Sequence, residues 1–364
     1  MPLLRIALDP KAPDPEGVRR AAEVLDRGGL LAFPTETVYG VGARGDLPEA
    51  MARLRALKER PDSERFTLHV GDPAQLVGEH VTVSETARRL MEAFWPGPLT
   101  LILPCEGGDT LGVRYPAHPV AQAILRAAGG PVYATSANPR GQPPPATARE
   151  VAEYFPEGIE ALVDGGPAAI RQASTIVAVE GETWAVLREG LVSRDMIARA
   201  AARRVLFVCT GNSCRSPMAQ ALFEVLVSRR LGIKPSDLAV HGLLVQSAGT
   251  SALPIGGASE HACRIIREKG GDLSAHVPTP LTRDLVERAD RIYAMSNVHL
   301  ERIRRFSESA AARARLLAPG GGEMADPIGG DEAEYRACAE QIERGIQAVL
   351  DGILAAPRPK ERRP

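Results

Sequence analysis

At 364 residues, the chain is longer than one hydrophobic core usually organises, which predicts two domains. Its 44% hydrophobic and 24% charged residues exclude a largely disordered chain. A formal net charge of -1 excludes a global field that would hold the chain on nucleic acid or on an anionic membrane. The sequence has no apolar run of about 18 residues and no basic, then apolar N-terminal segment, so we expect a cytoplasmic protein without membrane contact.

The first half alternates short β-rich runs with clusters of proline and glycine, which favours a mixed α+β domain with functional loops. Strands are predicted at 30–33, 99–103 and 174–179. The loop 34–42, which follows the first strand, offers threonine hydroxyls and an aromatic ring to a small polar ligand. By itself, this segment could equally be a plain strand and turn.

Two further segments of the first half bear on phosphate chemistry. Lys58 and Arg60 place two cations on one side of the chain, and residues 135–138 add hydroxyl and amide groups before a Pro/Gly loop. Two cations beside a hydroxyl-rich loop suit a triphosphate. The alternative is that Lys58 and Arg60 form a solvated charged face.

Residues 199–204 belong to a stretch rich in alanine and arginine that shows no sheet pattern. We interpret them as a linker between domains at 1–198 and 205–354. The proline-rich, charged tail at 355–364 is predicted to be disordered.

The second half alternates predicted strands, at 205–208 and 291–294, with helical patterns. This order predicts an α/β domain with a doubly wound parallel sheet. A helical repeat of apolar residues predicts the last helix, through Ile342, Ile346, Val349 and Ile353.

The segment from Cys209 to Pro217 has the order strand, loop, helix, with Ser216 predicted as the helix N-cap and Pro217 at its first position. Such a loop aims backbone N–H groups into one concavity, where they bind a phosphate dianion and stabilise a thiolate. The helix end and a nearby guanidinium lower a cysteine pKa, so Cys209 is expected to be an ionised nucleophile at neutral pH. Arg215 closes the loop and can grip two phosphoryl oxygens.

Other residues of this loop have predicted supporting roles. Gly211 permits a left-handed or close backbone, and Asn212 can hold the loop through side-chain hydrogen bonds. Ser216 can donate to the Cys209 sulfur when the cysteine is the leaving group. Cys214 can protect Cys209 by forming a disulfide on oxidation.

Two alternatives compete with a catalytic Cys209. A buried structural cysteine can precede an arginine by chance, although the strand, loop and helix context argues against it. Zinc binding by Cys209 and Cys214 lacks further ligands, and five cysteines, an odd number, predict mostly free thiols. We therefore expect no metal held by the protein's own side chains.

A cysteine-dependent phosphatase also needs a general acid for the leaving group. Asp326 and Pro327 lie in a glycine-rich loop ahead of the last helix, a pair that alone usually marks a turn. Residues 204–352 closely resemble the low-molecular-weight protein-tyrosine phosphatase family. The matching motifs are 208–219, Ser247-Ala248-Gly249-Thr250, Ala289-Asp290, Ala294-Met295 and Asp326-Pro327.

The resemblance implies a four-stranded parallel sheet, a phosphocysteine intermediate and Asp326 as the acid. It assigns the phosphate loop to Thr210, Gly211, Asn212, Ser213 and Cys214. In this family the residue before the second cysteine tends to be isoleucine in tyrosine-directed enzymes and threonine in bacterial protein-arginine phosphatases.

Three positions bear on the substrate, which the resemblance implies is a phosphotyrosine or phosphoarginine protein. Ser213 carries a hydroxyl and so resembles the arginine-directed group. Ser296 stands where the family often has an aspartate, and Ile328 stands where an aromatic residue often follows the Asp-Pro pair.

Residues 5–198 resemble the threonylcarbamoyl-adenylate synthase family, which implies a YrdC-like domain with a twisted mixed sheet. Beyond the segments above, the resemblance rests on residues 95–100, 112–119, 174–175 and 187–190. It implies condensation of L-threonine, bicarbonate and ATP, with Mg²⁺, into threonylcarbamoyl-AMP and pyrophosphate. This product serves the modification of adenosine 37 in tRNAs that read ANN codons.

The resemblance also assigns site residues. Around threonine it places Thr35, His69, Arg114 and Ser174. Around ATP it places Lys58, Arg60, Ser136, Asn138 and Arg188. After Arg60-Pro61 the family usually has Asn-Pro-Leu, whereas this chain has Glu64-Arg65-Phe66, which puts an acidic residue near the phosphates.

The leading hypothesis is a bifunctional enzyme, with a synthase followed by a phosphatase. Its partners would be a phosphoprotein and tRNA or the machinery that transfers the threonylcarbamoyl group. A rival hypothesis makes the first half a non-catalytic RNA- or nucleotide-binding module, because relatives of this fold bind double-stranded RNA through a basic face. Lys58, Arg60, Arg114 and Arg188 would serve either role.

Overall fold

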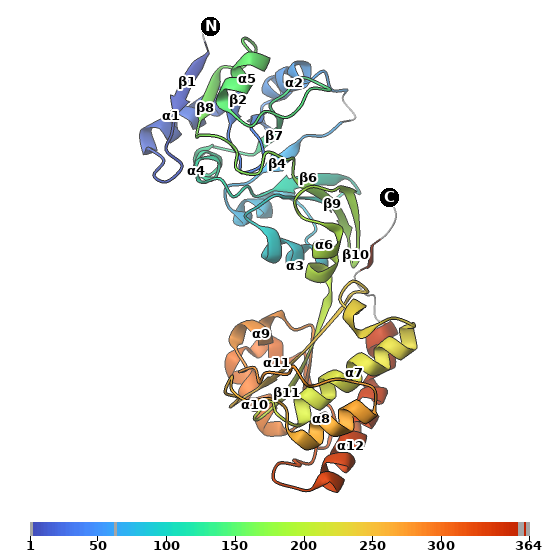
Figure 1. The fold of residues 1–364 in the computed structure, drawn as a ribbon. Coiled ribbons are helices and arrows are strands. Elements are labelled where there is room, and N and C mark those ends of the chain that lie inside the picture. The colour runs from blue at the N-terminus through green and yellow to red at the C-terminus, as the bar shows by residue number, and fades with distance from the viewer. Residues whose placement is uncertain (1–2, 62–63, 356–359, 362–364) are drawn as a thin grey trace. The chain divides into compact units, whose positions relative to one another are not determined.

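The computed structural model describes residues 3–61, 64–355 and 360–361 (Figure 1). The chain divides into two compact units, the first up to Ala201 and again from Glu361, the second from Ala202 to Lys360. Helix α6 (Arg194–Ala201) and strand β11 (Arg203–Cys209) leave only Ala202 between them. Most of the predicted linker at 199–204 is therefore helix or strand. The reason is packing, because Ile197, Ala198 and Ala201 bury one face of the alanine-rich helix.

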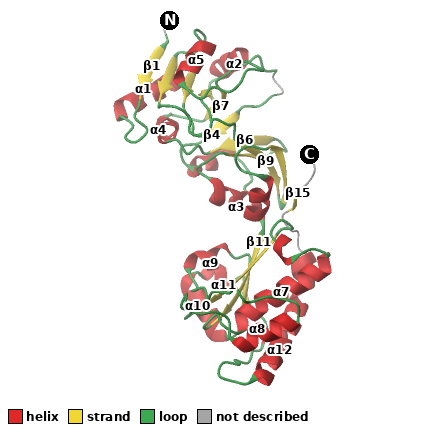
Figure 2. Ribbon diagram, viewed as in Figure 1, coloured by secondary structure: helices red, strands yellow, loops and turns green. Residues whose placement is uncertain are grey.

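The first unit is built on one mixed sheet with helices on both of its faces (Figures 1 and 2). The strand order is β1-β8-β2-β3-β7-β4-β6-β5-β9-β10, followed by the short β15 (Lys360–Glu361). Its ten longer strands are β1 (Leu4–Ala7), β2 (Leu31–Phe33), β3 (Gly40–Arg44), β4 (Thr67–His69), β5 (Leu99–Pro104), β6 (Thr110–Arg114), β7 (Val132–Ser136), β8 (Ala161–Asp164), β9 (Thr175–Glu180) and β10 (Thr183–Arg188).

Six α-helices and one 3₁₀ helix belong to the described part of this unit. With α6 they are α1 (Pro15–Asp26), α2 (Pro48–Leu57), the 3₁₀ helix η1 (Pro73–Glu79), α3 (Glu85–Phe94), α4 (Pro119–Ala127) and α5 (Ala148–Tyr154). Alternate side chains around β2 explain the two layers, since a strand points successive residues to opposite faces. Leu31 and Phe33 pack with α1 and α4, whereas Leu30 and Ala32 pack with α2 and α5.

The second unit has a four-stranded sheet in the order β12-β11-β13-β14, and all its strand pairs are parallel. The other strands are β12 (Leu243–Gly249), β13 (Arg291–Ala294) and β14 (Ala314–Leu316). The helices are α7 (Arg215–Leu231), η2 (Pro235–Asp237), α8 (Glu260–Glu268), α9 (Arg283–Arg288), α10 (Asn297–Phe306), α11 (Glu308–Ala311), η3 (Pro319–Gly321) and α12 (Glu332–Ala355). The predicted doubly wound parallel sheet is confirmed.

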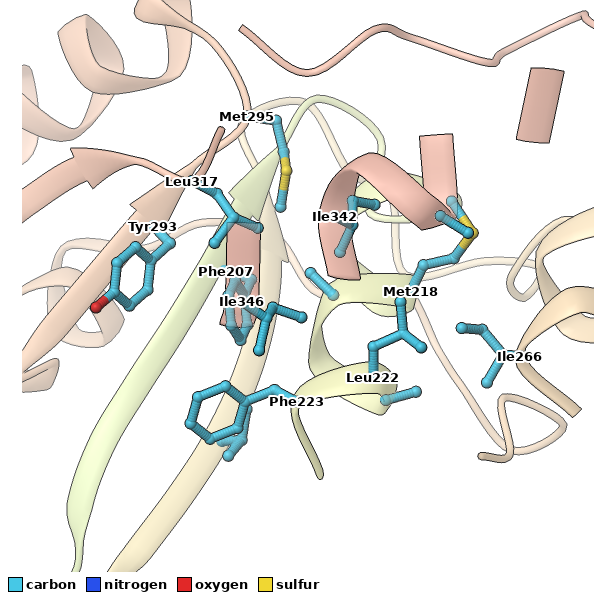
Figure 3. Close-up of a cluster of buried hydrophobic side chains, with 14 of the residues drawn as sticks. Phe207, Met218, Leu222, Phe223, Ile266, Tyr293, Met295, Leu317, Ile342 and Ile346 are labelled. Atoms are coloured by element: carbon cyan, nitrogen blue, oxygen red, sulfur yellow. The ribbon is translucent and has the colours of Figure 1, made fainter. Parts of the chain in front are cut away.

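Both faces of this sheet are buried, as parallel strands require. Val205 and Phe207 of β11 face a core formed with α7, α8 and α12, and Figure 3 shows Phe207 among side chains of α7 and α12. Leu206 and Val208 face the opposite core, which α9, α10 and α11 complete. Ligands of such folds bind beyond the carboxyl ends of the strands, which is where β11 delivers Cys209.

The C-terminal tail was predicted to be disordered over 355–364. Ala355 is the last residue of α12, and Lys360–Glu361 form β15, while the remainder of the tail lies outside the described residues. Within the described part of the chain, no helix is long and apolar enough to cross a membrane.

Candidate active sites

The loop between β11 and α7 surrounds the Cys209 sulfur with hydrogen-bonding groups. Cys209 is only 2% exposed and is the last residue of its strand. The Asn212 backbone N–H donates to its sulfur at 3.2 Å, and the Ser216 hydroxyl lies 2.9 Å from it. Backbone and side chain thus converge on the predicted nucleophile at the start of a helix.

Ser216 is not the helix N-cap that the sequence predicted. Helix α7 begins two residues earlier than predicted, at Arg215, after Cys214, whose side chain makes no capping bond. The fully buried Ser216 hydroxyl accepts a hydrogen bond from Asn212 Nδ2 at 2.8 Å, and its own proton can go to the Cys209 sulfur, at 2.9 Å, or to the Ala248 carbonyl, at 3.4 Å. The residue expected to cap the helix contacts the reacting atom instead.

The left-handed residue of the loop is Asn212, with φ of 54°, and not Gly211 as predicted. Asparagine tolerates this conformation when its side chain is held. Here Oδ1 accepts the Thr279 backbone N–H at 2.7 Å, and the backbone carbonyl contacts His276 Nε2 at 2.7 Å. The close backbone contact that was predicted for Gly211 occurs at Gly249 instead, because a Cβ there would lie 2.5 Å from the Thr210 carbonyl oxygen.

Arg215 and Asp326 form an ion pair at this loop. Arg215 is 6% exposed, whereas the Asp326 side chain, on the glycine-rich loop before α12, is 41% exposed. Arg215 Nη2 also donates to Thr210 Oγ1 at 3.4 Å. The structure therefore brings the predicted phosphate-binding arginine and the predicted acid together, although 111 residues separate them.

Cys209 was predicted to be ionised at neutral pH, and this structure does not support that prediction. Burial raises the pKa of its thiol, and the hydrogen bonds from Ser216 and Asn212 and the charge of Arg215 lower it without reversing that direction. Burial accounts for the difference, because the sulfur is almost fully buried.

Cys214 and Ser213 complete the loop. Cys214 is 6% exposed, and its sulfur lies 3.1 Å from the Tyr335 hydroxyl. The Ser213 hydroxyl is 3.6 Å from that sulfur, and its carbonyl accepts the Ser259 N–H at 2.9 Å. All five cysteines are free thiols, so the protective disulfide with Cys209 stays a prediction.

A pocket of about 280 Å³ in the first unit gathers residues from seven strands and from the loops beside them. Seven of the nine residues predicted to bind threonine or ATP line it: Thr35, Arg60, His69, Arg114, Ser136, Ser174 and Arg188. Lys58 and Asn138 are not among its described lining residues. Instead, Lys58 Nζ donates to the carbonyls of Ser136, at 2.8 Å, and of Asn138, which holds the lining strand and loop in place.

Arg114 is buried in this pocket with part of its guanidinium unused. Nη2 donates to Glu36 Oε1 at 2.8 Å and to Thr37 Oγ1 at 2.6 Å, whereas Nε has no hydrogen-bond partner within the described chain. The other Glu36 oxygen accepts the Ala117 N–H at 3.0 Å. An unpaired buried donor is costly, so a carboxylate or phosphate ligand would be stabilised at Arg114 Nε.

Arg188 is the second guanidinium of the pocket. It donates to the Ser174 carbonyl at 2.9 Å from Nη2 and at 3.1 Å from Nε, and the Ser174 hydroxyl lies 2.9 Å from that of Thr100. Burial and the nearby Arg114 charge lower the pKa of Arg188. Two mutually repelling cations in one pocket favour an anionic ligand between them.

Two further basic residues have perturbed titrations. Burial and the Arg114 charge lower the pKa of His69 to about 3, and its Nδ1 lies 3.0 Å from the Thr67 carbonyl. The ring is therefore neutral, with the proton on Nδ1 and a free acceptor at Nε2. Burial and Arg60 lower the pKa of Lys58 to about 8.

Glu64, the acidic departure from the family pattern, pairs with two arginines. Its carboxylate lies 3.4 Å from Arg60 Nε and 3.4 Å from Arg140 Nη2. Arg60 also lies over the Phe66 ring, 5.2 Å from its centre. Sequence reasoning missed Glu36, Thr100 and Arg140, because an acid, a strand threonine and a loop arginine give no separate signal for a ligand.

Family models match both units. The Sua5, YciO and YrdC family model, described as "Telomere recombination", matches residues 23–190. The model of the low molecular weight phosphotyrosine protein phosphatase family matches residues 204–357. The two matches do not overlap, and each lies almost wholly within one unit.

Curated relatives and a solved structure resemble the chain. The threonylcarbamoyl-AMP synthase of Bacillus subtilis is 38% identical over 194 residues, which cover 50% of this chain and 56% of that protein. The chain thus spans about half the length of this relative. A Sua5 variant from Pyrococcus abyssi is 25% identical, with a TM-score of 0.50 over 86% of this chain and 98% of that one.

A shorter relative is matched over nearly its whole length. The threonylcarbamoyl-AMP synthase of Halorhodospira halophila is 38% identical over 188 residues, which cover 49% of this chain and 97% of that protein. The chain therefore belongs to the threonylcarbamoyl-AMP synthase family through its first unit, to which a low-molecular-weight phosphotyrosine phosphatase domain is fused.

Proposed function

We propose that the first unit makes threonylcarbamoyl-AMP from L-threonine, bicarbonate and ATP. The observation that carries this proposal is one pocket that brings together the buried Arg114 guanidinium, the more exposed Arg188 guanidinium, and hydroxyl and histidine groups that suit a small polar ligand. The threonine carboxylate would take the free Nε of Arg114. The neutral His69 would accept a hydrogen bond at Nε2 from the threonine ammonium, with Thr35 and Ser174 beside it.

The nucleotide would lie against Arg60, Ser136 and Arg188, with Lys58 and Asn138 fixing the strand behind it. The threonine amine would add to bicarbonate with loss of water, and a carbamate oxygen would displace pyrophosphate from the ATP α-phosphorus. Positioning and charge neutralisation would supply most of the rate. Mg²⁺ would arrive with ATP, because the described residues contain no cluster of three or more His, Cys, Asp or Glu side chains that could hold a metal.

The rival function is a non-catalytic RNA- or nucleotide-binding module, since the same arginines would attract phosphates. One assay separates the two proposals. We expect pyrophosphate release that requires both threonine and bicarbonate. RNA binding without such release would reject the synthase, whereas release would connect the unit to tRNA and to the enzymes that transfer the threonylcarbamoyl group to adenosine 37.

We propose that the second unit hydrolyses phosphorylated protein side chains through Cys209. The Cys209 thiol would pass its proton, by way of the bound phosphoryl group, to the Asp326 carboxylate, and the thiolate would attack phosphorus while Arg215 binds two phosphoryl oxygens. Asp326 would then protonate the leaving group. Water would cleave the phosphocysteine and give its proton to Asp326, and Ser216 would donate to the departing sulfur. The observation that carries the proposal is the convergence of Asn212 N–H, Ser216 and Arg215 on one buried thiol.

For the substrate, we propose phosphoarginine over phosphotyrosine because of the hydroxyl at Ser213. The test compares kcat/KM on a phosphoarginine and a phosphotyrosine peptide for the wild type and for Ser213→Ile. We expect the wild type to favour phosphoarginine and Ser213→Ile to shift towards phosphotyrosine. Cys209→Ser is the inactive control, and a wild-type preference for phosphotyrosine would reject the assignment.

A further inference from the structure

A buried histidine that the phosphatase mechanism leaves unused adjoins the phosphate loop. His299, in the first turn of α10, is 2% exposed. Its Nε2 lies 2.9 Å from Thr210 Oγ1, and its Nδ1 lies 2.9 Å from Ser296 Oγ. Ser296 occupies the helix N-cap position but makes no capping bond, so its hydroxyl is committed to the histidine.

Arg215 has only donors, so Thr210 Oγ1 accepts from Arg215 Nη2, at 3.4 Å. The second lone pair of this oxygen could also accept from His299. Among the described residues, however, the only acceptor for the Thr210 proton is His299 Nε2, which favours an unprotonated Nε2. The ring proton then sits on Nδ1 and donates to Ser296 Oγ.

The hydrogen bonds from Ser296 through His299 and Thr210 to Arg215 form a relay. The charges around His299 keep the ring of this relay neutral. Burial and Arg215, from α7, lower the pKa of His299 to about 4. Asp326 and Glu323, from the loop ahead of α12, act in the opposite direction but do not outweigh them. The ring is thus neutral at pH 7, and it would become a cation beside Arg215 only near or below pH 4.

We propose that His299 is a positioning residue that aims Arg215 through Thr210. By holding the Thr210 proton, His299 turns an oxygen lone pair towards Arg215 Nη2. This contact would keep the guanidinium on the phosphoryl group when Asp326 leaves it to protonate the leaving group. The inference deepens the proposed phosphatase function and rests on it.

The same relay explains why a serine at position 296, where the family often has an aspartate, suits this site. A carboxylate at 296 would accept from Nδ1 and raise the pKa of His299. A proton would then occupy Nε2 at higher pH, the bond to Thr210 would reverse, and a second cation would stand beside Arg215. Serine supports the neutral ring without stabilising its charged form.

The test uses the full chain and measures kcat, KM and inhibition by inorganic phosphate between pH 4 and 8. His299→Asn is too short to reach Thr210, so we expect phosphate to bind about tenfold more weakly, with KM raised, because the guanidinium is no longer aimed. His299→Gln places an oxygen near the former Nε2 and should restore most of the affinity. Val298→Ala, at an exposed neighbour, is the matched control.

Ser296→Asp tests the charge argument separately. We expect this variant to bind phosphate about as well as the wild type at pH 8. As the pH is lowered, its phosphate affinity should fall at a higher pH than that of the wild type. Unchanged phosphate binding in His299→Asn, or an unshifted profile in Ser296→Asp, would overturn the inference. If the wild type hydrolyses neither phosphopeptide, the proposed function fails, while calorimetric binding of inorganic phosphate still decides the role of His299.

Discussion

Each unit pairs the arginine proposed to bind its anionic ligand with a carboxylate, but the two carboxylates are held differently. In the first unit, the Arg114 and Glu36 side chains are 7% and 12% exposed, and the second Glu36 oxygen is tied to the Ala117 N–H. In the second unit, Arg215 is equally buried at 7%, but Asp326 is 41% exposed on a glycine-rich loop. The second Asp326 oxygen accepts the Ile328 N–H of its own loop at 3.3 Å, so among the described residues only the pair with Arg215 ties this carboxylate to the rest of the unit.

The difference matches the two proposed chemistries. A fixed carboxylate can orient an arginine but cannot follow a leaving group. A mobile carboxylate can release the arginine to a phosphoryl group and then act as a general acid. We therefore expect the Arg114–Glu36 pair to orient the arginine in the first unit. In the second unit, we expect Asp326 of the Arg215–Asp326 pair to transfer a proton.

The largest effect should come from Asp326→Ala. The variant loses the proton donor, so we expect phosphatase kcat to fall roughly 10²- to 10⁴-fold. Phosphate affinity should be unchanged or slightly higher, because Arg215 loses its competing partner. Steady-state kinetics with phosphate inhibition measures both, and a variant with weaker phosphate affinity but intact kcat would show that Asp326 only orients Arg215.

Glu36→Ala probes the fixed pair. Without its carboxylate, Arg114 and the Ala117 loop lose their common anchor, so we expect the KM for threonine to rise about tenfold. The amide oxygen of Glu36→Gln can still accept one of these bonds. Its KM for threonine should therefore lie between those of the wild type and of Glu36→Ala. Threonine-dependent pyrophosphate release provides the measurement. A lower KM in Glu36→Ala would mean that Glu36 competes with the substrate and does not orient its site.

The two sites also differ in what the sequence could predict. The phosphatase loop is contiguous from Cys209 to Arg215, so its strand, loop and helix could be predicted from local pattern. Its left-handed residue and the role of Ser216 could not, because Thr279 and His276, far along the chain, decide how Asn212 sits.

The synthase pocket is assembled from distant strands and loops. Its residues could be assigned only through the family resemblance. Glu36 was not predicted as a site residue, because a single acidic residue in a loop gives no sequence pattern for a site. The predicted direction of the Cys209 pKa was wrong for a related reason, because the burial that raises it is a property of the whole fold.

A pH profile can sharpen the comparison, because only the first unit relies on a lysine beside its arginines. Below pH 8, Lys58 Nζ carries its charge, and above it the folded protein loses that charge. We expect kcat/KM for ATP to fall by up to about tenfold per pH unit above this point. Lys58→Arg should remove the decline, and a decline that persists in that variant would assign the titration to another group.

The smallest effect concerns the exposed set of Arg60, Glu64 and Arg140, whose side chains are 28%, 40% and 60% exposed. Glu64 would repel the ATP phosphates, and Arg140 offsets its charge. Exposed ion pairs contribute about 0.2–1 kcal/mol, so Arg140→Ala should raise the KM for ATP only about 1.4- to fivefold.

In a Glu64→Gln background, the same Arg140→Ala substitution should have no effect, because the charge that it offsets is gone. A double-mutant cycle on the KM for ATP measures this coupling, and Arg149→Ala, at an exposed arginine of helix α5, is the matched control. If Arg140→Ala raises the KM equally in both backgrounds, Arg140 contacts the phosphates itself. The first unit would then contain a fourth ligand-binding arginine besides Arg60, Arg114 and Arg188, one whose carboxylate partner, Glu64, is 40% exposed, against 12% for the Glu36 partner of Arg114.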